Sequence, residues 1–404
     1  MSKTVLLVGA FDVKDEEYAF VRKQIEAQGC KTLTMNFGTL GSTDLFPVDI
    51  ENAEVAKAGG TNINQFKKDG DRGKAMAAMG KGAAILVQQL YGESKFDGVF
   101  GMGGSGGSSV ISNAMRALPI GVPKVLISTL AAGDTTIITG VKDITMIPSI
   151  VDVAGLNPIS EKVFKEGVGA ICGMVKMDYA SSAEQKPVIA TTMFGNTTEC
   201  VDMCRKSLVD KGYEVLVFHC TGTGGKIMEN LVDEGFVYAV LDITTTEWAD
   251  EICEGVYSAG TTRLSAPGKA GIPHLIVPGC VDMVNFGPIA TVPERFKDRN
   301  LYEWNSLVTL MRTNIEENIK MGEIFAQKAN EAKGRVAFLL PLKGVSILDS
   351  EGERFWWPEA NQAMFDAIKK NLKPGIGLVE IDANINDKEF SDKAVKMLMA
   401  LMGQ

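Results

Sequence analysis

The chain has 404 residues, 45% hydrophobic and 23% charged, a composition typical of globular proteins long enough for two or three domains. Its net charge is −9 and its isoelectric point is near 5.1. Proteins bind nucleic acids through clustered Lys and Arg. Because the sequence contains no basic run, we expect no nucleic acid partner.

Hydropathy and cysteine usage indicate a cytoplasmic protein. The apolar run near the first residue is far shorter than the core of a signal peptide. No stretch reaches the ~18 apolar residues that a membrane span needs. The seven cysteines are scattered, and no further Cys or His joins Cys200 and Cys204 in a metal site, so we expect reduced thiols. We also expect no membrane contact and a homo-oligomer, dimer or larger.

The first segment reads as a strand, a helix and a second strand. Residues 4–8 and 31–36 have strand patterns, and 15–28 form a predicted helix that stops at a glycine. The loop after the first strand lies where open α/β sheets bind ligands. Asp12 and Lys14 are therefore candidate contacts for magnesium and phosphate, and capping of the helix explains Asp12 equally well.

The apolar spacing of residues 71–89 predicts a long helix with Arg72 in its first turn. A cation there is unfavourable for the helix dipole unless an anion lies nearby. Arg72 is therefore a candidate phosphate contact, and a solvated arginine explains it equally well.

A glycine-rich stretch lies between a predicted strand at 96–100 and a predicted helix at 109–118. Glycine lets a ligand approach the main chain, and a helix start exposes unpaired N–H groups with a partial positive charge. The stretch therefore predicts an anion cradle, most often for phosphate. Its candidate residues are Gly103, Gly104, Ser105, Gly106, Gly107, Ser108 and Ser109. The alternative is a glycine-rich turn that binds nothing.

The spacing of Gly101, Gly103 and Gly106 fits a dinucleotide motif, which alone is a weak signal. The next predicted strand, 124–128, ends without the acidic residue that would hold a ribose hydroxyl. The stretch also lacks the lysine of phosphate-loop NTPases, because serines follow Gly107. The sequence therefore predicts a phosphate loop of neither standard kind.

Small residues follow the predicted strand at 124–128 and suit close packing beside a base or ribose. These residues are Thr129, Ala131, Ala132 and Gly133. Asp134 comes next and is, with Asp12, a candidate magnesium ligand.

The order of elements in the first segment recurs in the second half. A polar stretch near 179–186 predicts a linker. With an offset of 183 positions, Glu16 matches Glu199 and Arg22 matches Arg205. We therefore expect an α/β protein with two Rossmann-like domains, 1–183 and 184–404, mainly parallel sheets, and a ligand cleft at the carboxyl ends of the strands.

Three predicted strands of the second half, at 215–218, 238–241 and 274–277, end in polar residues. Such a cluster predicts a second site, for a carboxylate or a sugar-like group. The C-terminal part adds a largely helical stretch at 301–332, and Arg312 and Lys343 as possible positive charges for an acid.

The catalytic candidates come from these strand ends. His219 is a candidate general acid or base, and a hydrogen-bonded structural histidine explains it as well. Lys226 follows glycines as a phosphate-binding lysine would, and a surface lysine is an equal explanation. Asp282 is the third catalytic candidate, whereas Asp250 and Glu251 are predicted on a solvated helix face.

Six segments occur in one order along the chain: GAFDVK at 9–14, GGSGGS at 103–108, SIVDVAGLN at 149–157, HCTGTGG at 219–225, TTTE at 244–247 and DMVNFGP at 282–288. Together they resemble the uncharacterised bacterial family that shares an ATP-binding domain with the plant tobamovirus resistance protein. The resemblance implies that the first domain binds ATP with magnesium. It implies a nucleotide site at Phe11, Asp12, Val13, Lys14, 103–109 and 129–133. The first loop departs from the family pattern in having Ala10-Phe11 where a small hydroxyl residue is expected.

We therefore expect an ATP-binding protein that performs ATP-dependent transfer or ligation on a small acidic metabolite, with Mg²⁺. The alternatives are a non-catalytic nucleotide-binding regulatory protein and an NAD-dependent dehydrogenase, which the missing ribose acid disfavours. The expected partners are an adenine nucleotide and an unidentified small polar or acidic molecule. The antiviral action of the plant protein needs a viral partner and is not expected here.

Overall fold

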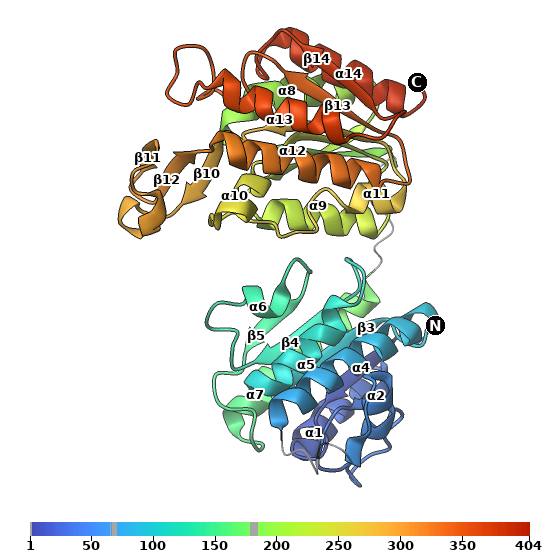
Figure 1. Ribbon diagram of the computed structural model, residues 1–404. Helices are drawn as coiled ribbons and strands as arrows, with labels where there is room; N and C mark the ends of the chain where they lie inside the picture. Colours follow the sequence, from blue (N-terminus) through green and yellow to red (C-terminus); the bar gives the residue numbers. More distant parts are fainter. Residues whose placement is uncertain (1, 65, 67–70, 178–184) are drawn as a thin grey trace. The chain divides into compact units, whose positions relative to one another are not determined.

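The computed structural model describes residues 2–64, 66, 71–177 and 185–404. The chain divides into two compact units, 1–182 and 183–404. In each unit, helices cover a central sheet (Figure 1). Most of the linker predicted near 179–186 lies outside the described residues.

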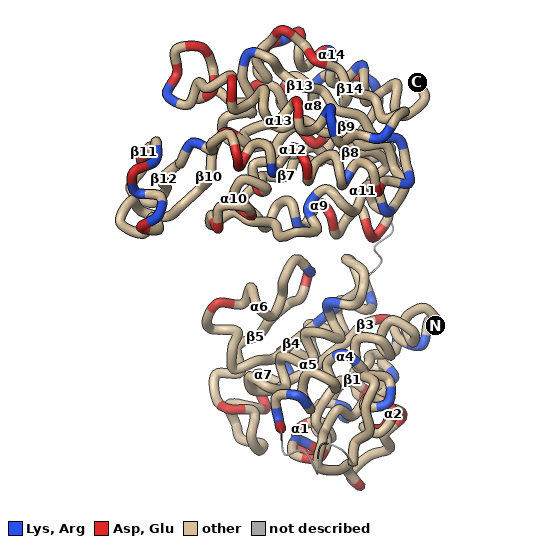
Figure 2. Tube along the Cα trace, in the orientation of Figure 1, with Lys and Arg blue, Asp and Glu red and all other residues tan. Residues whose placement is uncertain are grey.

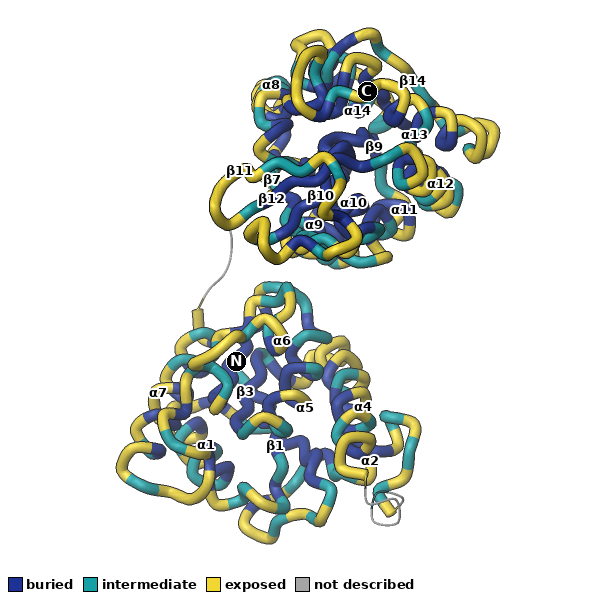
Figure 3. The backbone as a smooth tube through the Cα atoms, turned by 60° about the vertical axis from the view of Figure 1, so that its left-hand side comes forward, coloured by how far each residue is buried: buried dark blue, intermediate teal, exposed yellow. Residues whose placement is uncertain are grey.

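The first unit contains a five-stranded parallel sheet in the order β2-β1-β3-β4-β5. Its strands are β1 (Thr4–Gly9), β2 (Lys31–Asn36), β3 (Gly98–Gly103), β4 (Lys124–Ser128) and β5 (Thr145–Pro148). The strands β1 and β3 are almost completely buried (Figure 3), and so is β4. Their sequences are continuous apolar runs because helices cover both faces of the sheet.

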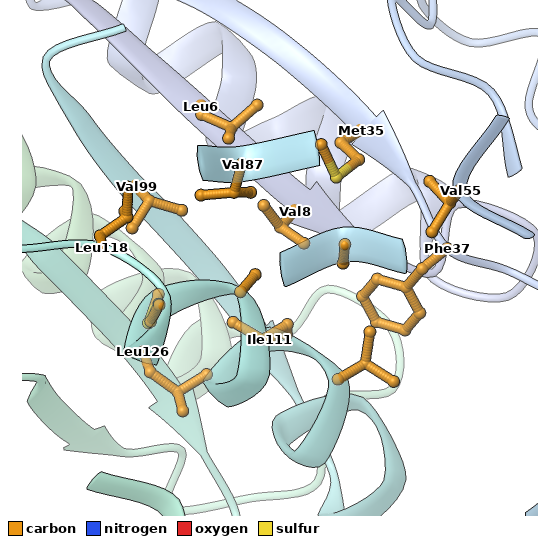
Figure 4. Close-up of a cluster of buried hydrophobic side chains, with 14 of the residues drawn as sticks. Leu6, Val8, Met35, Phe37, Val55, Val87, Val99, Ile111, Leu118 and Leu126 are labelled. Atoms are coloured by element: carbon orange, nitrogen blue, oxygen red, sulfur yellow. The ribbon is translucent and has the colours of Figure 1, made fainter. Parts of the chain in front are cut away.

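The helices of the first unit form two layers. They are α1 (Asp15–Ala27), α2 (Asn52–Ala58), α4 (Arg72–Gly92), α5 (Ser105–Arg116), α6 (Thr136–Thr139) and α7 (Pro158–Lys176). Val5 and Leu7 of β1 pack with α1 and α7, whereas Leu6 and Val8 pack with α2, α4 and α5 (Figure 4). Successive residues of a strand point to opposite faces, so β1 supplies both cores.

The connection between β3 and α5 is shorter than predicted. The strand continues to Gly103 and the helix begins at Ser105, four residues before the expected start. A Cβ at Gly101 would lie 2.5 Å from Cγ2 of Ile111. Glycine at position 101 therefore lets α5 pack closely against β3 and does not form part of a turn.

The second unit contains a six-stranded parallel sheet in the order β14-β13-β9-β8-β6-β7. Its strands are β6 (Val188–Met193), β7 (Glu214–His219), β8 (Ala239–Thr244), β9 (His274–Gly279), β13 (Val336–Pro341) and β14 (Gly377–Ile381). A smaller antiparallel sheet, β10-β12-β11, consists of β10 (Met283–Phe286), β11 (Leu301–Asn305) and β12 (Val308–Arg312). The α/β class with mainly parallel sheets is thereby confirmed.

The large sheet of the second unit also has helices on both faces. The helices are α8 (Thr198–Asp210), α9 (Thr223–Asp233), α10 (Glu247–Cys253), α11 (Ala266–Ala270), α12 (Ile315–Asn330), α13 (Pro358–Asn371) and α14 (Lys388–Leu401). Short 3₁₀ turns lie at Gly195–Thr197, Ile289–Thr291 and Glu294–Phe296. The prediction of helix over 301–332 is correct for α12 and wrong for 301–312, which form β11 and β12.

The offset of 183 positions is confirmed for the first helix and second strand of each unit. The helix α8 begins and ends 183 positions after α1, and β7 begins and ends 183 positions after β2. The first five strands of both sheets also follow the same spatial order. The two units are therefore wound alike. The offset of 183 also pairs Gly41 with Gly224, but these two differ in place, since Gly224 lies in α9 and Gly41 lies before α2.

Charged residues of both signs are interspersed along both units (Figure 2). The net charge of −9 is therefore spread over many segments. Among the described residues, we find no helix with the length and apolar character of a membrane span.

Candidate functional site

A cavity of about 770 Å³ lies in the first unit at the carboxyl ends of β1, β2, β3 and β4. The chain winds from β1 to β2 on one side and then returns to β3 on the other side of β1. Doubly wound sheets bind ligands in the crevice at this reversal. The lining residues that carry the argument below are Asp12, Lys14, Arg72, Ser105, Gly106 and Gly107.

The amino end of α5 forms one wall of this cavity. Its first backbone hydrogen bond runs from Ser108 N to Gly104 O at 2.8 Å. Among the described residues, the N–H groups of Ser105, Gly106 and Gly107 have no acceptor. All three residues line the cavity, so three donors and the positive end of a twelve-residue helix face it.

The glycines of this wall leave space that side chains would occupy. A Cβ at Gly106 would lie 3.8 Å from Nη2 of Arg72, and one at Gly107 would lie 3.9 Å from Cζ of Phe37. Both neighbours line the same cavity. These contacts are ordinary in length, so a longer side chain at either glycine would extend into the cavity rather than strain the backbone.

Asp12 lies on the wall formed by the loop after β1. Its Oδ2 accepts a hydrogen bond from the N–H of Leu40 at 2.8 Å, and its Oδ1 is buried and has no partner among the described residues. The interpretation of Asp12 as a helix cap is wrong, because Lys14 occupies the N-cap position of α1 and no side chain caps it. Asp12 therefore presents one held and one free carboxylate oxygen.

Among the residues that the structure describes, two cationic side chains line the cavity. Arg72 is the first residue of α4, and the preceding Asp71 caps that helix by accepting a hydrogen bond from Lys74 N at 3.0 Å. This hydrogen bond lowers the pKa of Asp71. The ammonium group of Lys14 donates to the carbonyl oxygen of Val153. Arg72 is exposed and the structure brings it to the same cavity as the amino end of α5.

Three residues of the predicted nucleotide site have other roles. Phe11 is fully buried against Tyr18, and its N–H donates to Asn36 Oδ1 at 3.1 Å, so it is part of the core. The hydroxyl of Ser108 is buried 2.6 Å from that of Ser128, where it joins α5 to β4. Ser109 is exposed on α5 and does not line the cavity. Val13, another residue of the predicted site, does line it.

The loop after β4 contributes only Thr129 to the cavity wall; Ala131, Ala132 and Gly133 do not line it. Asp134 accepts hydrogen bonds from the N–H and hydroxyl of Thr136, at 2.9 and 2.6 Å, which lower its pKa. Asp134 therefore stabilises a turn.

No cluster of three or more Asp, Glu, His or Cys side chains that could hold a metal occurs in the described parts of the chain.

The sequence interpretation missed several lining residues. They include Phe37, Gly38, Thr39, Leu40, Phe66, Met76 and Asp152. Residues 37–40 follow β2 directly, so the rule that ligands lie at strand ends would have found them. Asp152 lies in the segment at 149–157 that carried the family resemblance, but nothing in its pattern indicated a role.

The glycine-rich loop of the second unit is already occupied. Oε1 of Glu247 accepts hydrogen bonds from the N–H groups of Gly222 and Gly225, at 2.9 and 3.1 Å. Its other carboxylate oxygen accepts a hydrogen bond of 2.6 Å from Nε of Arg263. Lys226 is exposed on α9, and the loop before it holds a carboxylate of the protein itself, so the phosphate-loop interpretation of Lys226 is wrong.

The three catalytic candidates lie in different surroundings. His219 is exposed at the end of β7, with its ring centroid 5.5 Å from that of Phe194. Asp282 follows β9, which lies three strands away from β7, a separation of about 14 Å at ~4.8 Å per strand. Asp282 is completely buried and accepts a 2.8 Å hydrogen bond from Ser346. The structure therefore does not bring His219 and Asp282 into one site.

Burial raises the pKa of two acidic groups in this unit that the sequence analysis considered. Burial, reinforced by nearby Asp349, raises the pKa of Asp282 to about 7. The prediction that Asp250 is solvated is wrong, because its side chain is fully buried and bonded to Asn285. Burial raises the pKa of Asp250 to about 7. Arg312 is also buried, 3.2 Å from Asp349, so it is not a free positive charge for a ligand.

The fold and the cavity define a doubly wound α/β protein of two similarly wound units, with a cavity at the strand ends of the first. Residues 3–180 match the N-terminal domain, and residues 186–402 the C-terminal domain, of Uncharacterised protein family (UPF0261). The chain belongs to this family. The resemblance found in the sequence is confirmed at this level.

Two relatives illustrate the match. The chain is 47% identical over 403 residues to a UPF0261 protein of Clostridium tetani, and the match covers 100% of both chains. It is 42% identical over 337 residues to the ToMV resistance protein Tm-1(GCR237) of Solanum lycopersicum, covering 82% of this chain and 45% of the plant protein. A UDP-N-acetylglucosamine 2-epimerase from Rickettsia bellii matches at 10% identity and a TM-score of 0.25, over 100% of this chain and 96% of that chain. That last similarity is too low to indicate a function.

Proposed function

We propose that the first unit binds ATP with Mg²⁺ in the cavity at the carboxyl ends of β1 and β3. The observation that carries this proposal is the amino end of α5, where three N–H groups that find no acceptor in the described part of the chain face the cavity. Backbone donors at a helix start are suited to phosphate, because their dipoles and the helix dipole add. The guanidinium of Arg72 on the same wall suits a second phosphate oxygen.

The side chains of the wall fit a magnesium ion that is shared with phosphates. Mg²⁺ usually takes one or two protein carboxylates and completes its shell with water and phosphate oxygens. The buried, unpartnered Oδ1 of Asp12 is suited to be such a ligand. When bound, the ion would neutralise part of the phosphate charge, while Asp12 itself stays fixed by the N–H of Leu40.

The rest of the cavity suits the nucleoside. Its volume of about 770 Å³ lies within the usual range of about 300–1,000 Å³ for small-molecule sites. Phe37, Phe66 and Met76 supply apolar surface for a base, and Thr129 supplies a hydroxyl. The neighbouring strand β4 ends at Ser128 rather than at an acid, which argues against an NAD-dependent dehydrogenase.

We propose that the bound ATP is used for transfer or ligation on a small acidic metabolite. The alternative is a regulatory protein that binds ATP without turning it over. Release of ADP or AMP that depends on an added carboxylic acid supports the enzyme. Stoichiometric ATP that stays intact with every acid in a panel supports the regulatory protein.

Calorimetric titration of the purified chain tests the binding proposal. We expect ATP to bind with a stoichiometry of one and more tightly with Mg²⁺ than with EDTA, and AMP and NAD to bind more weakly because they offer fewer or differently placed phosphate oxygens. Tighter binding of NAD than of ATP, or no heat with any nucleotide, contradicts the proposal.

A further inference from the structure

Tyr18 connects α1 to the two strands that border the cavity. Its side chain is fully buried, with its ring edge-on to that of Phe11 at 5.0 Å between centroids. The ring lies so close to Gly9 that a Cβ there would come within 2.4 Å of Cζ of Tyr18. The phenol therefore crosses the end of β1, and its hydroxyl reaches β3.

The Tyr18 hydroxyl lies where the pairing of β1 and β3 stops. The two strands are in register from Val5 with Gly98 to Val8 with Gly101. After that pair, the N–H of Met102 donates to the Tyr18 oxygen at 2.8 Å. The same oxygen lies 2.7 Å from Val8 O and 3.0 Å from Met102 O, the two carbonyls to which its proton can be donated. An oxygen atom thus stands between the strands where a direct backbone hydrogen bond would continue the ladder.

This insertion has a geometric consequence. A direct N–H to carbonyl bond spans about 2.9 Å between heavy atoms, whereas the path through the hydroxyl joins two such bonds in series. Because the two bonds meet at an angle at the hydroxyl oxygen, we expect Met102 N and Val8 O to lie further apart than the ~2.9 Å of a direct bond. The Tyr18 hydroxyl also lies at the reversal of winding between β1 and β3. Met102 and Gly103 line the cavity there.

We infer that Tyr18 is a positioning residue that holds β1 and β3 apart at their carboxyl ends and so keeps the phosphate-binding cavity open. The ligand in this inference rests on the proposed function; the spacing rests on the hydrogen bonds alone. The ring of a phenylalanine would fill the same core, so the effect of the hydroxyl is separable from packing.

The variant Tyr18→Phe tests the inference, with Ile25→Val as its matched control. Ile25 lies seven residues further along α1, about 10 Å away, and is buried in the same core. Both variants are expected to lower thermal stability modestly. We expect Tyr18→Phe to lower the affinity for ATP with Mg²⁺, because closing the gap between β1 and β3 displaces Met102 and Gly103 at the cavity wall. We expect Ile25→Val to bind as the parent chain does.

Equal affinity of Tyr18→Phe and the parent chain overturns the inference, and so do equal losses of affinity in the two variants. A crystal structure of Tyr18→Phe without nucleotide gives a second readout. Closure of the separation between Met102 N and Val8 O to about 2.9 Å supports the spacing role, and an unchanged separation overturns it. If the parent chain binds no nucleotide, the proposed function fails, and this separation still decides the role of Tyr18.

Discussion

Asp12 accepts a hydrogen bond from the N–H of Leu40 at 2.8 Å, and this bond joins the loops that follow β1 and β2. The second carboxylate oxygen is left buried and unpartnered. Gly38 stands directly beside it, since a Cβ there would lie 2.3 Å from Cγ of Asp12. Position 38 therefore excludes larger residues, and the carboxylate is held in one orientation.

The substitution Asp12→Asn is expected to separate metal binding from folding. The amide oxygen can still accept from Leu40, but the free carboxylate oxygen is lost. We expect the affinity for ATP with Mg²⁺ to fall about ten- to hundred-fold, and the affinity for ATP with EDTA to change little. Calorimetry with both solutions measures the difference. Asp44→Asn, an equal charge change at an exposed residue, is the control; equal losses in both variants would refute the role of Asp12.

The substitution Gly106→Asp is expected to abolish nucleotide binding without unfolding the chain. A carboxylate at this position extends toward Arg72 and repels phosphate. An acidic residue in the first turn of α5 favours the helix dipole, so stability is expected to be preserved. Titration calorimetry and thermal melting measure the two effects.

Gly169→Asp is the control for this experiment. Gly169 is an exposed glycine of α7, and nothing lies within 4 Å of a Cβ built there. We expect this variant to bind ATP normally. Unchanged affinity of Gly106→Asp would show that the amino end of α5 does not hold phosphate.

Arg263 is expected to be essential for the stability of the second unit. It is 1% exposed, and it contacts Asp242 and Glu247 at 2.6 Å each. Arg263→Met leaves two buried carboxylates without their partner, which costs about 3–5 kcal/mol in comparable cases. Urea denaturation measures this loss. Arg295→Met, which breaks an exposed pair with Glu254, is expected to cost at most about 1 kcal/mol, and a similar cost for both would contradict the prediction.

Asp250 is expected to make stability fall as the pH rises. Burial raises its pKa from 3.8 to about 7, so between these values the folded chain binds more protons than the unfolded chain. The contribution of the protonated Asp250 to the free energy of unfolding is complete below pH 3.8 and is lost as the pH rises through about 7. Its size is about 1.4 kcal/mol for each unit by which the two pKa values differ.

Asp250→Asn removes this titration while keeping the shape of the side chain. We expect the difference in unfolding free energy between the parent chain and the variant to move in favour of the variant from pH 4.5 to 7.5. Guanidinium denaturation at both values measures it. A difference that is independent of pH would mean that Asp250 is ionised in the folded chain across this range.

The periodic parts of the fold were predictable from the sequence. The first strand, helix and second strand have clear apolar spacing and a glycine stop, and their repeat at an offset of 183 correctly predicted α8 and β7. The amino end of α5 was misplaced because glycine has low helix propensity. Gly106 and Gly107 nevertheless lie in the helix, where they line the cavity and extend no side chain into it.

The second unit was harder to predict because its polar residues pair over long distances in the chain. The sequence pattern around Asp250 is that of an exposed helix, but the side chain is buried and bonded to Asn285, 35 residues away. The pairing of Glu247 with Gly222 is likewise invisible in the local pattern. The alternation in β11 and β12 extends over five residues each, too short to distinguish from a helix by periodicity.

The carboxylate of Glu247 has a consequence for how the two units respond to solutes. In the second unit, the side chain of Glu247 fills the glycine-rich loop at 222–225. Because Glu247 is part of the chain, this contact does not depend on the concentration of any solute. Among the described residues, the donors of α5 have no such built-in acceptor, so an anion bound there would come from solution. On the proposed function, small anions in solution are therefore expected to raise the melting temperature of the first unit by mass action, whereas Glu247 already fills the glycine-rich loop of the second unit.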